Sequence, residues 1–140
     1  MPSRILKPSS LFRALVLCAT LLYALGAAAA ELAQQSSQAG GVSISVKPTE
    51  VSAAATTWLF EVTLTTHSGD LGDDLARTAT IVDAAGKQYP AVGWEGDPPG
   101  GHHRKGVLRF KARSPRSDAL ELRILRQGET APRTFRWKLK

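Results

Sequence analysis

Three histidines are the side chains in this sequence that are best suited to chemistry at neutral pH. Imidazole is a common ligand for zinc and copper in proteins, and a carboxylate can complete such a site. We therefore expect a divalent metal site, for zinc or copper, that combines at least two histidines with one carboxylate. The candidate ligands lie in loops or at a strand end: His67, His102, His103, Asp70 and Asp97.

The spacing of these residues leaves other interpretations open. Adjacent residues on an extended chain point to opposite sides, so His102 and His103 can bind one ion together only if the loop curls. The histidines can instead be exposed side chains without a ligand. Their ring nitrogens can also bond loop carbonyls and carboxylates, and so fix a loop rich in glycine and proline against the domain.

The sequence gives little support for catalysis. Cys18 is the only cysteine, it lies in the N-terminal segment, and no Gly-x-Ser-x-Gly motif is present. Ser68 directly follows His67, but neighbours along a strand point apart and do not place a base next to a hydroxyl. Asp73 and Asp74 lie in a polar segment where water keeps both carboxylates ionised. We therefore expect a binding protein and not an enzyme.

Basic residues gather toward the C-terminus. Residues 31–103 contain three Lys or Arg and nine acids, whereas residues 104–140 contain twelve Lys or Arg and three acids. Arg109 and Arg123 alternate with apolar neighbours, as residues on the solvated face of a strand do. Such charges can pair with acids on adjacent strands. Alternatively, they form a basic sheet face that binds an anionic envelope component, and the protein is then a structural or adhesion module.

The elements that position these residues are predicted to be β-strands. The clearest strand has large apolar residues at alternate positions, which are Trp58, Phe60, Val62 and Leu64. Alternation or β-branched runs predict strands over residues 42–47, 58–67, 78–82, 87–94, 108–112, 120–124 and 135–139. Pro48 is expected to end the first strand. Residues 95–106 have no apolar side chain apart from two prolines and predict a loop.

About seven short strands separated by turns predict an all-β fold, an immunoglobulin-like antiparallel β-sandwich. The single helical candidate is Asp70–Arg77, in which Asp73 or Asp74 can cap one turn. The core is expected to contain the large aromatic side chains Trp58, Phe60, Trp94, Phe110, Phe135 and Trp137.

Residues 1–30 have the composition of a secretory signal peptide. Basic residues precede an apolar run over residues 14–25, and a run of four alanines ends at residue 30. The run is shorter than the roughly 20 residues that cross a bilayer, so we expect cleavage, no stable membrane span and a periplasmic or secreted protein. Nucleic acid is then not an expected partner. Residues 31–40 are small and polar and predict a flexible linker, and residues 41–140 form one domain.

The motifs from residue 57 to residue 125 resemble a small, largely uncharacterised β-sandwich domain of exported or membrane-anchored prokaryotic proteins. The shared pattern is Thr-His-Ser, then Trp-x-Gly, then Gly-Gly-His-His-x-x-Gly-x-Leu-x-Phe. The resemblance implies no activity. It implies only that one pattern includes His67, Trp94, Gly100, Gly101, His102, His103 and Gly106.

Overall fold

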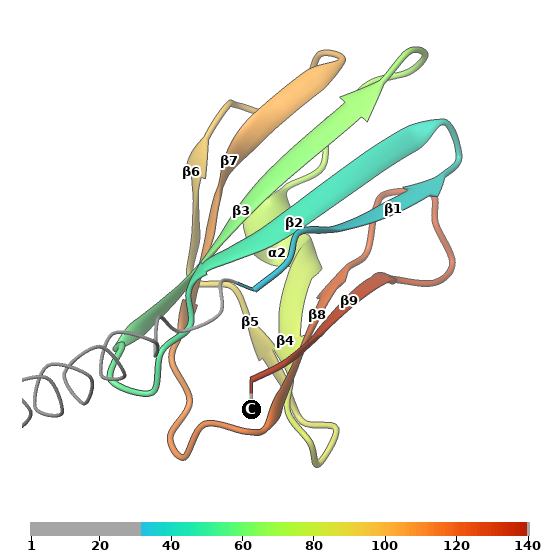
Figure 1. Ribbon diagram of the computed structural model, residues 1–140. Helices are drawn as coiled ribbons and strands as arrows, with labels where there is room; N and C mark the ends of the chain where they lie inside the picture. Colours follow the sequence, from blue (N-terminus) through green and yellow to red (C-terminus); the bar gives the residue numbers. More distant parts are fainter. Residues whose placement is uncertain (1–31, 140) are drawn as a thin grey trace, which may run out of the picture. The chain divides into compact units, whose positions relative to one another are not determined.

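The computed structural model describes residues 32–139, and the expected signal peptide over residues 1–30 lies outside them. The described chain forms two antiparallel sheets, with the strand orders β1-β2-β3-β7-β6 and β5-β4-β8-β9 (Figure 1). The elements are β1 (Gln35–Ala39), β2 (Val42–Glu50), β3 (Thr57–Thr66), α2 (Leu75–Thr78), β4 (Ala79–Val82), β5 (Gln88–Pro90), β6 (Gly93–Gly96), β7 (His103–Lys111), β8 (Ala119–Ile124) and β9 (Arg133–Lys138). The predicted all-β fold with two antiparallel layers is confirmed. Within residues 32–139, no helix has the length and apolar character needed to cross a membrane.

Alternation along the strands places one face of each sheet in a common core. Phe60 of β3 contacts Phe110 of β7 edge to face, with ring centres 5.6 Å apart, and contacts Trp137 of β9 at 5.9 Å. Trp137 belongs to the second sheet, so these rings join the two layers. The predicted aromatic core is confirmed for all its members except Trp94, which is only partly buried and packs against the core from β6.

The segment 87–94, predicted as one strand, is divided between the two sheets. β5 pairs with β4, whereas β6 pairs with β7. The chain changes sheets at Ala91 and Val92, whose N–H groups donate to carbonyls of β4 and β7. The Ala91 bond to Ala79 continues the β5–β4 ladder one residue past Pro90, and the missing N–H of Pro90 is tolerated because β5 is an edge strand. The predicted loop over residues 95–106 is also shorter, because β6 ends at Gly96 and β7 begins at His103.

The first predicted strand does not end at Pro48. β2 continues to Glu50, and its pairing with β3 shifts between Pro48 and Glu50. A local irregularity in the ladder accommodates a residue without an N–H donor.

The expectation of a flexible linker over residues 31–40 is wrong for Gln35–Ala39, which forms strand β1 at the edge of the five-stranded sheet. Gly40 and Gly41 join it to β2 with φ angles of 54° and 75°, the left-handed region that a tight hairpin turn requires. The side-chain amide of Gln35 donates through Nε2 to the backbone carbonyl of Arg136, and its Oε1 accepts a hydrogen bond from the backbone N–H of Arg136. These two bonds join β1 to β9, the edge strand of the other sheet. An exposed edge strand needs no apolar side chains, and the sequence pattern therefore did not indicate it.

The helical candidate reduces to the single turn α2. Asp74 is the N-cap residue, but its side chain makes no capping hydrogen bond. Asp73 does not cap the turn either, because its carboxylate accepts bonds from the Arg126 guanidinium and from Gln127 N–H. The predicted capping role is therefore wrong, and Asp73 instead fixes the β8–β9 connection.

Gly106 of β7 has no room for a side chain, since an added Cβ atom would lie 2.5 Å from Trp94 Cζ2 and 2.6 Å from the Glu95 carbonyl oxygen. We expect Gly106→Ala to lower the free energy of unfolding by about 1–3 kcal/mol through overpacking. Urea denaturation followed by tryptophan fluorescence measures this change. Gly93→Ala on β6 is the control, because no atom lies within 4 Å of its added Cβ. Equal destabilisation by the two substitutions would contradict the prediction.

Candidate functional site

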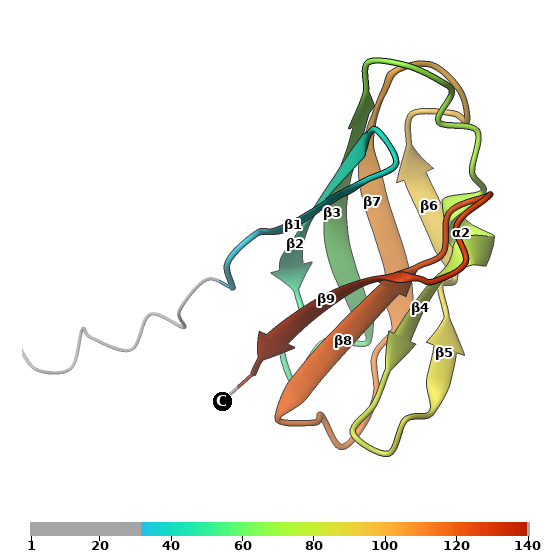
Figure 2. The same cartoon turned by 90° about the vertical axis from the view of Figure 1, so that its right-hand side faces the viewer.

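One end of the sandwich is built from two loops that bind each other. The loop after β3 and the loop between β6 and β7 lie together at this end (Figure 2). Leu71 N–H donates to Gly101 O, and Gly100 N–H donates to Leu71 O. The Asp70 carboxylate accepts the Gly101 N–H group at 2.8 Å. Asp70 therefore holds the two loops together.

Asp97 has a similar structural contact. Its Oδ2 accepts the backbone N–H of Lys105 at 2.8 Å, and its carbonyl accepts the indole N–H of Trp94 at 2.9 Å. Both bonds close the turn between β6 and β7. The two carboxylates that the sequence suggested as metal ligands thus each accept a bond from the backbone.

Arg104 of β7 is the central contact of this end. Its side chain is almost completely buried, with 1% relative exposure. Its Nη1 donates to the carbonyls of Leu71 at 2.8 Å and Asp73 at 2.7 Å, and its Nη2 donates to the Asp97 carbonyl at 3.4 Å. The guanidinium carbon lies 5.4 Å from the centre of the Trp94 ring. Burial lowers the pKa of Arg104, and the nearby aspartates, Asp73 first among them, act in the opposite direction.

The sequence predicts that Arg104 lies in a polar loop, and its buried role is not among the predictions. The signal was present, because Arg104 lies two residues before Gly106 and four before the buried Leu108. The register Leu64↔Arg104 continues the pairing of β3 with β7 at this point. Positions of equal parity on a strand share a face, so Arg104 points inward with Leu108.

The three histidines lie at this end of the sandwich, and all are exposed. Thr66 N–H donates to the His102 carbonyl at 2.9 Å, which places His67 and His102 on adjacent chain segments. Residues 32–139 nevertheless contain no group of three or more His, Cys, Asp or Glu that could hold a metal ion. The metal site therefore stays a prediction from the sequence.

The test of the metal site is calorimetric titration of the protein with zinc or cupric ions. If the site exists, the parent protein gives saturable binding heat, and the His67→Ala variant does not.

Arg109 and Arg123 do not share a face, so the expectation that both line one basic surface is wrong. Arg109 belongs to β7 of the five-stranded sheet, and Arg123 belongs to β8 of the four-stranded sheet. Each lies between two buried residues, so the two side chains point to opposite outer surfaces. On the five-stranded sheet, Arg109 pairs with Glu95, and Lys105 pairs with Glu61 at 3.2 Å. Cross-strand pairing thus accounts for Arg109 and Lys105 on that surface.

The outer surface of the four-stranded sheet carries three basic residues around one acid. We define the basic face as Glu121 and Arg123 of β8 with Arg136 and Lys138 of β9. Glu121 Oε1 accepts a bond from Arg123 Nε at 2.5 Å, and its Oε2 accepts one from Arg136 Nε at 2.6 Å. Burial acts to raise the pKa of Glu121, but the bonds and charges of the two arginines outweigh burial and lower it. Glu121 is therefore ionised at neutral pH and orients both guanidinium groups.

This arrangement is suited to binding anions. Both arginines bond Glu121 through Nε, and a guanidinium has further N–H donors on its two terminal nitrogens. The side chain of Arg136 is 71% exposed and that of Arg123 is 32% exposed. Glu121 is in register with Val82 of β4 and Arg136 of β9, and Arg123 is in register with Thr80 of β4 and Thr134 of β9. Of these four neighbours, Arg136 alone is charged. Three positive charges against one negative charge leave the basic face cationic.

No protein-family model matches the sequence, and no curated protein matches it. Among solved structures, the chain is similar to a DUF4426 family protein from Pseudomonas aeruginosa. The two are 15% identical with a TM-score of 0.43, and the match covers 75% of this chain and 93% of that chain. Function is therefore inferred from the residues of this chain.

Removing the Arg104 guanidinium takes a donor from three loop carbonyls. Leu71 O keeps the bond from Gly100 N–H and Asp97 O keeps the bond from the Trp94 indole, whereas Asp73 O loses its bond to the arginine. We expect Arg104→Met to lower the free energy of unfolding by about 2–4 kcal/mol. We also expect faster amide exchange at Leu71 and Gly100. Thermal unfolding and hydrogen exchange measure the two effects.

Lys105→Met is the matched control on the next residue. The Lys105 side chain is 56% exposed and pairs with Glu61 at the surface, so we expect a change of at most about 1 kcal/mol. A similar loss of stability in both variants, or unchanged exchange in Arg104→Met, would show that Arg104 does not hold the loops.

Proposed function

We propose that the protein is an exported, non-enzymatic binding module that attaches to an anionic component of the cell envelope through the basic face. The observation that carries the proposal is the pair of arginines that bond the two carboxylate oxygens of Glu121. Planar guanidinium groups form paired, charge-assisted hydrogen bonds with phosphate. Phosphate-bearing headgroups are therefore the anionic groups that suit this surface best.

We infer that the sandwich is of the immunoglobulin-like type. The order β2-β3-β7-β6 corresponds to strands A, B, E and D of an immunoglobulin domain, and β9-β8-β4-β5 corresponds to G, F, C and C′. Strand β1 is an addition at the edge of the first sheet. On this assignment the basic face lies on strand G at the edge of the second sheet and on its inner neighbour F.

Export is part of the proposal and is supported by the composition of residues 1–30. A periplasmic or secreted domain meets the anionic lipids and polymers of the envelope. Two acids of the acidic first part, Glu61 and Glu95, pair with bases on the five-stranded sheet, which is not the sheet that carries the basic face.

The test is sedimentation of the purified protein with vesicles that contain phosphatidylglycerol, compared with neutral phosphatidylcholine vesicles. We expect binding to the anionic vesicles only, and we expect it to weaken as ionic strength rises. The double variant Arg136→Gln with Lys138→Gln should reduce the affinity about 30-fold, since each basic residue near an anionic surface contributes about 1 kcal/mol.

The control is Arg109→Gln with Lys105→Gln, which removes two charges from the opposite sheet. We expect its affinity to stay within about threefold of the parent protein. An equal loss in both double variants would mean that net charge, and not the basic face, governs binding. Equal binding of the parent protein to neutral vesicles would refute the proposal.

A further inference from the structure

The outer surface of the four-stranded sheet is hollowed next to the basic face. The hollow measures about 280 Å³ and is open to solvent. It lies between the β4–β5 turn, which contributes Asp83 and Ala84, and the first residues of β8. Glu121 and Arg136 of the basic face form part of its wall. The hollow and the basic face are therefore one continuous surface.

Small side chains explain why the sheet is hollowed at this place. Ala119 has the same parity along β8 as Glu121, so its methyl group lies on the outer face. The register that pairs β4 with β8 leads, past the end of β4, to Ala84 opposite Ala119. Both alanines are exposed, and a methyl group is too short to fill the space beside the long side chains of Glu121 and Arg136. The result is a depression with two methyl groups at its base and charged groups at its side.

Two cations lie beside the hollow. The Arg136 side chain is 71% exposed, and Glu121 accepts its Nε–H group, while a guanidinium has further donors on its two terminal nitrogens. Lys138 of β9 is exposed and is in register with Ala119. Residues directly opposite each other on paired strands have Cβ atoms about 5 Å apart. A phosphate above Ala119 is therefore within reach of both cations.

The hollow also has an acceptor for hydroxyl groups. The Glu121 carboxylate is 17% exposed, and each of its oxygens accepts one arginine N–H group. A carboxylate oxygen has two lone pairs, so each oxygen can accept one further hydrogen bond.

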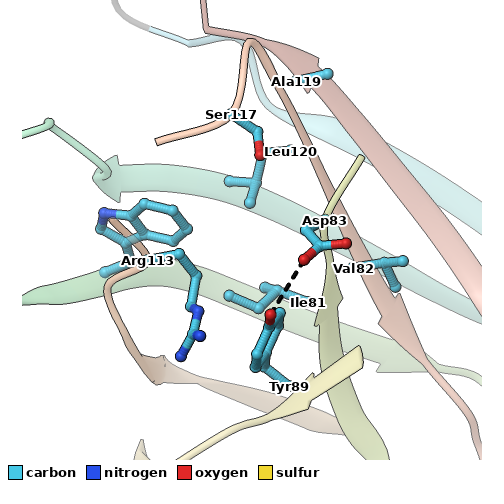
Figure 3. A pocket seen from close by; sticks show the side chains of 9 residues that line it. Ile81, Val82, Asp83, Tyr89, Arg113, Ser117, Ala119 and Leu120 are labelled. Atoms are coloured by element: carbon cyan, nitrogen blue, oxygen red, sulfur yellow. Dashed lines mark hydrogen bonds between the residues drawn. The ribbon is translucent and has the colours of Figure 1, made fainter. Parts of the chain in front are cut away.

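The second acid at the hollow is used within its own turn. Asp83 accepts the backbone N–H of Lys87 at 2.9 Å and the Tyr89 hydroxyl at 3.1 Å, the second of which Figure 3 shows. Asp83 also lines the narrow pocket drawn in Figure 3, which has room for about one water molecule. Glu121 is therefore the carboxylate of the hollow that is best placed to bind a ligand.

We propose that the hollow binds the headgroup of a lipid whose phosphate carries a short polyol, such as glycerol. Arg136 and Lys138 bind the phosphate through charge-assisted hydrogen bonds. Hydroxyl groups of the polyol donate to Glu121, and its carbon chain lies on the methyl groups of Ala84 and Ala119.

The size and shape of the hollow agree with this ligand. At roughly 30 Å³ for each water-sized group, the hollow has room for about nine such groups, which is the size of a phosphate with a three-carbon polyol. The β4–β5 turn bounds the hollow on one side. A headgroup that ends in its polyol suits a space that is closed on that side.

This assignment rests on the proposed attachment to an anionic envelope component, and it names the group that is recognised. Charge alone binds lipids of equal charge equally well, whereas the hollow distinguishes between their headgroups. The headgroup preference and the attachment can therefore be tested separately.

The experiment compares vesicles that contain phosphatidylglycerol with vesicles that contain the same fraction of phosphatidylmethanol. Both lipids carry one negative charge, but the methyl ester has no hydroxyl group. We expect the parent protein to bind the phosphatidylglycerol vesicles at least about fivefold more tightly, because the methyl ester lacks the hydroxyl bonds to Glu121. Sedimentation of the protein with each kind of vesicle measures the two affinities.

Ala119→Leu fills the hollow and changes no charge. We expect its affinity for phosphatidylglycerol vesicles to fall to that for phosphatidylmethanol vesicles, which should stay within about twofold of the parent value. Ala84→Leu makes the same test from the β4–β5 turn. Ala53→Leu is the control, since Ala53 is an exposed alanine of the β2–β3 loop, and this variant should keep the preference. Circular dichroism shows whether each variant is folded.

Equal binding of the two anionic vesicles by the parent protein, or a preference that persists in both filled variants, would overturn the headgroup assignment and leave the attachment through the basic face in place. Tighter binding of soluble poly(glycerol phosphate) than of the vesicles, at equal phosphate concentration, would overturn the lipid as the occupant. Absence of binding to both anionic vesicles would overturn this assignment together with the proposed function.

Discussion

Burial of the Arg104 guanidinium is the constraint on which the histidine-bearing end of the molecule depends. A buried cation is costly unless polar groups replace water around it. Here three backbone carbonyls from two loops and the face of Trp94 surround it. Trp94 in turn lies against Gly106, where a Cβ atom would not fit. One inward-pointing arginine thus determines the path of both loops and the choice of residues around it.

This packing gives a structural reason for much of the pattern that suggested a known domain. Trp94 and Gly106 support Arg104, and Gly100 and Gly101 have φ angles of 115° and 75° that residues with side chains rarely adopt. Gly100 and Gly101 also exchange backbone bonds with Leu71. These four residues of the pattern therefore have structural roles in the two loops at this end of the sandwich. The side chains of the three histidines are exposed and lie outside this packing.

The basic C-terminal part of the chain serves three different purposes. One group of arginines crosslinks the backbone: Arg133 donates to carbonyls on both sides of the β1–β2 turn, and Arg116 donates to those of Val51 and Leu139. A second group pairs with acids, as Arg126 does with Asp73 at 2.8 Å. The third group forms the basic face. Residues 32–139 contain no cysteine, so arginine bonds to distant carbonyls take the place of covalent crosslinks.

The sequence alone determined most of the residues that face the core, although it did not indicate the inward-pointing Arg104. The period of two along Trp58–Leu64 and along Leu120–Ile124 is a local property, and it correctly predicted strands, buried faces and two antiparallel layers. Tertiary structure decided which strands share a sheet, and therefore separated β5 from β6 and Arg109 from Arg123. Tertiary structure also decided that residues 35–39 pair as strand β1 with β2. It decided as well that the carboxylates of Asp70 and Asp97 accept hydrogen bonds from backbone N–H groups. Sheet membership and hydrogen-bond partners depend on contacts between segments far apart in the chain, and a local pattern carries no information about them.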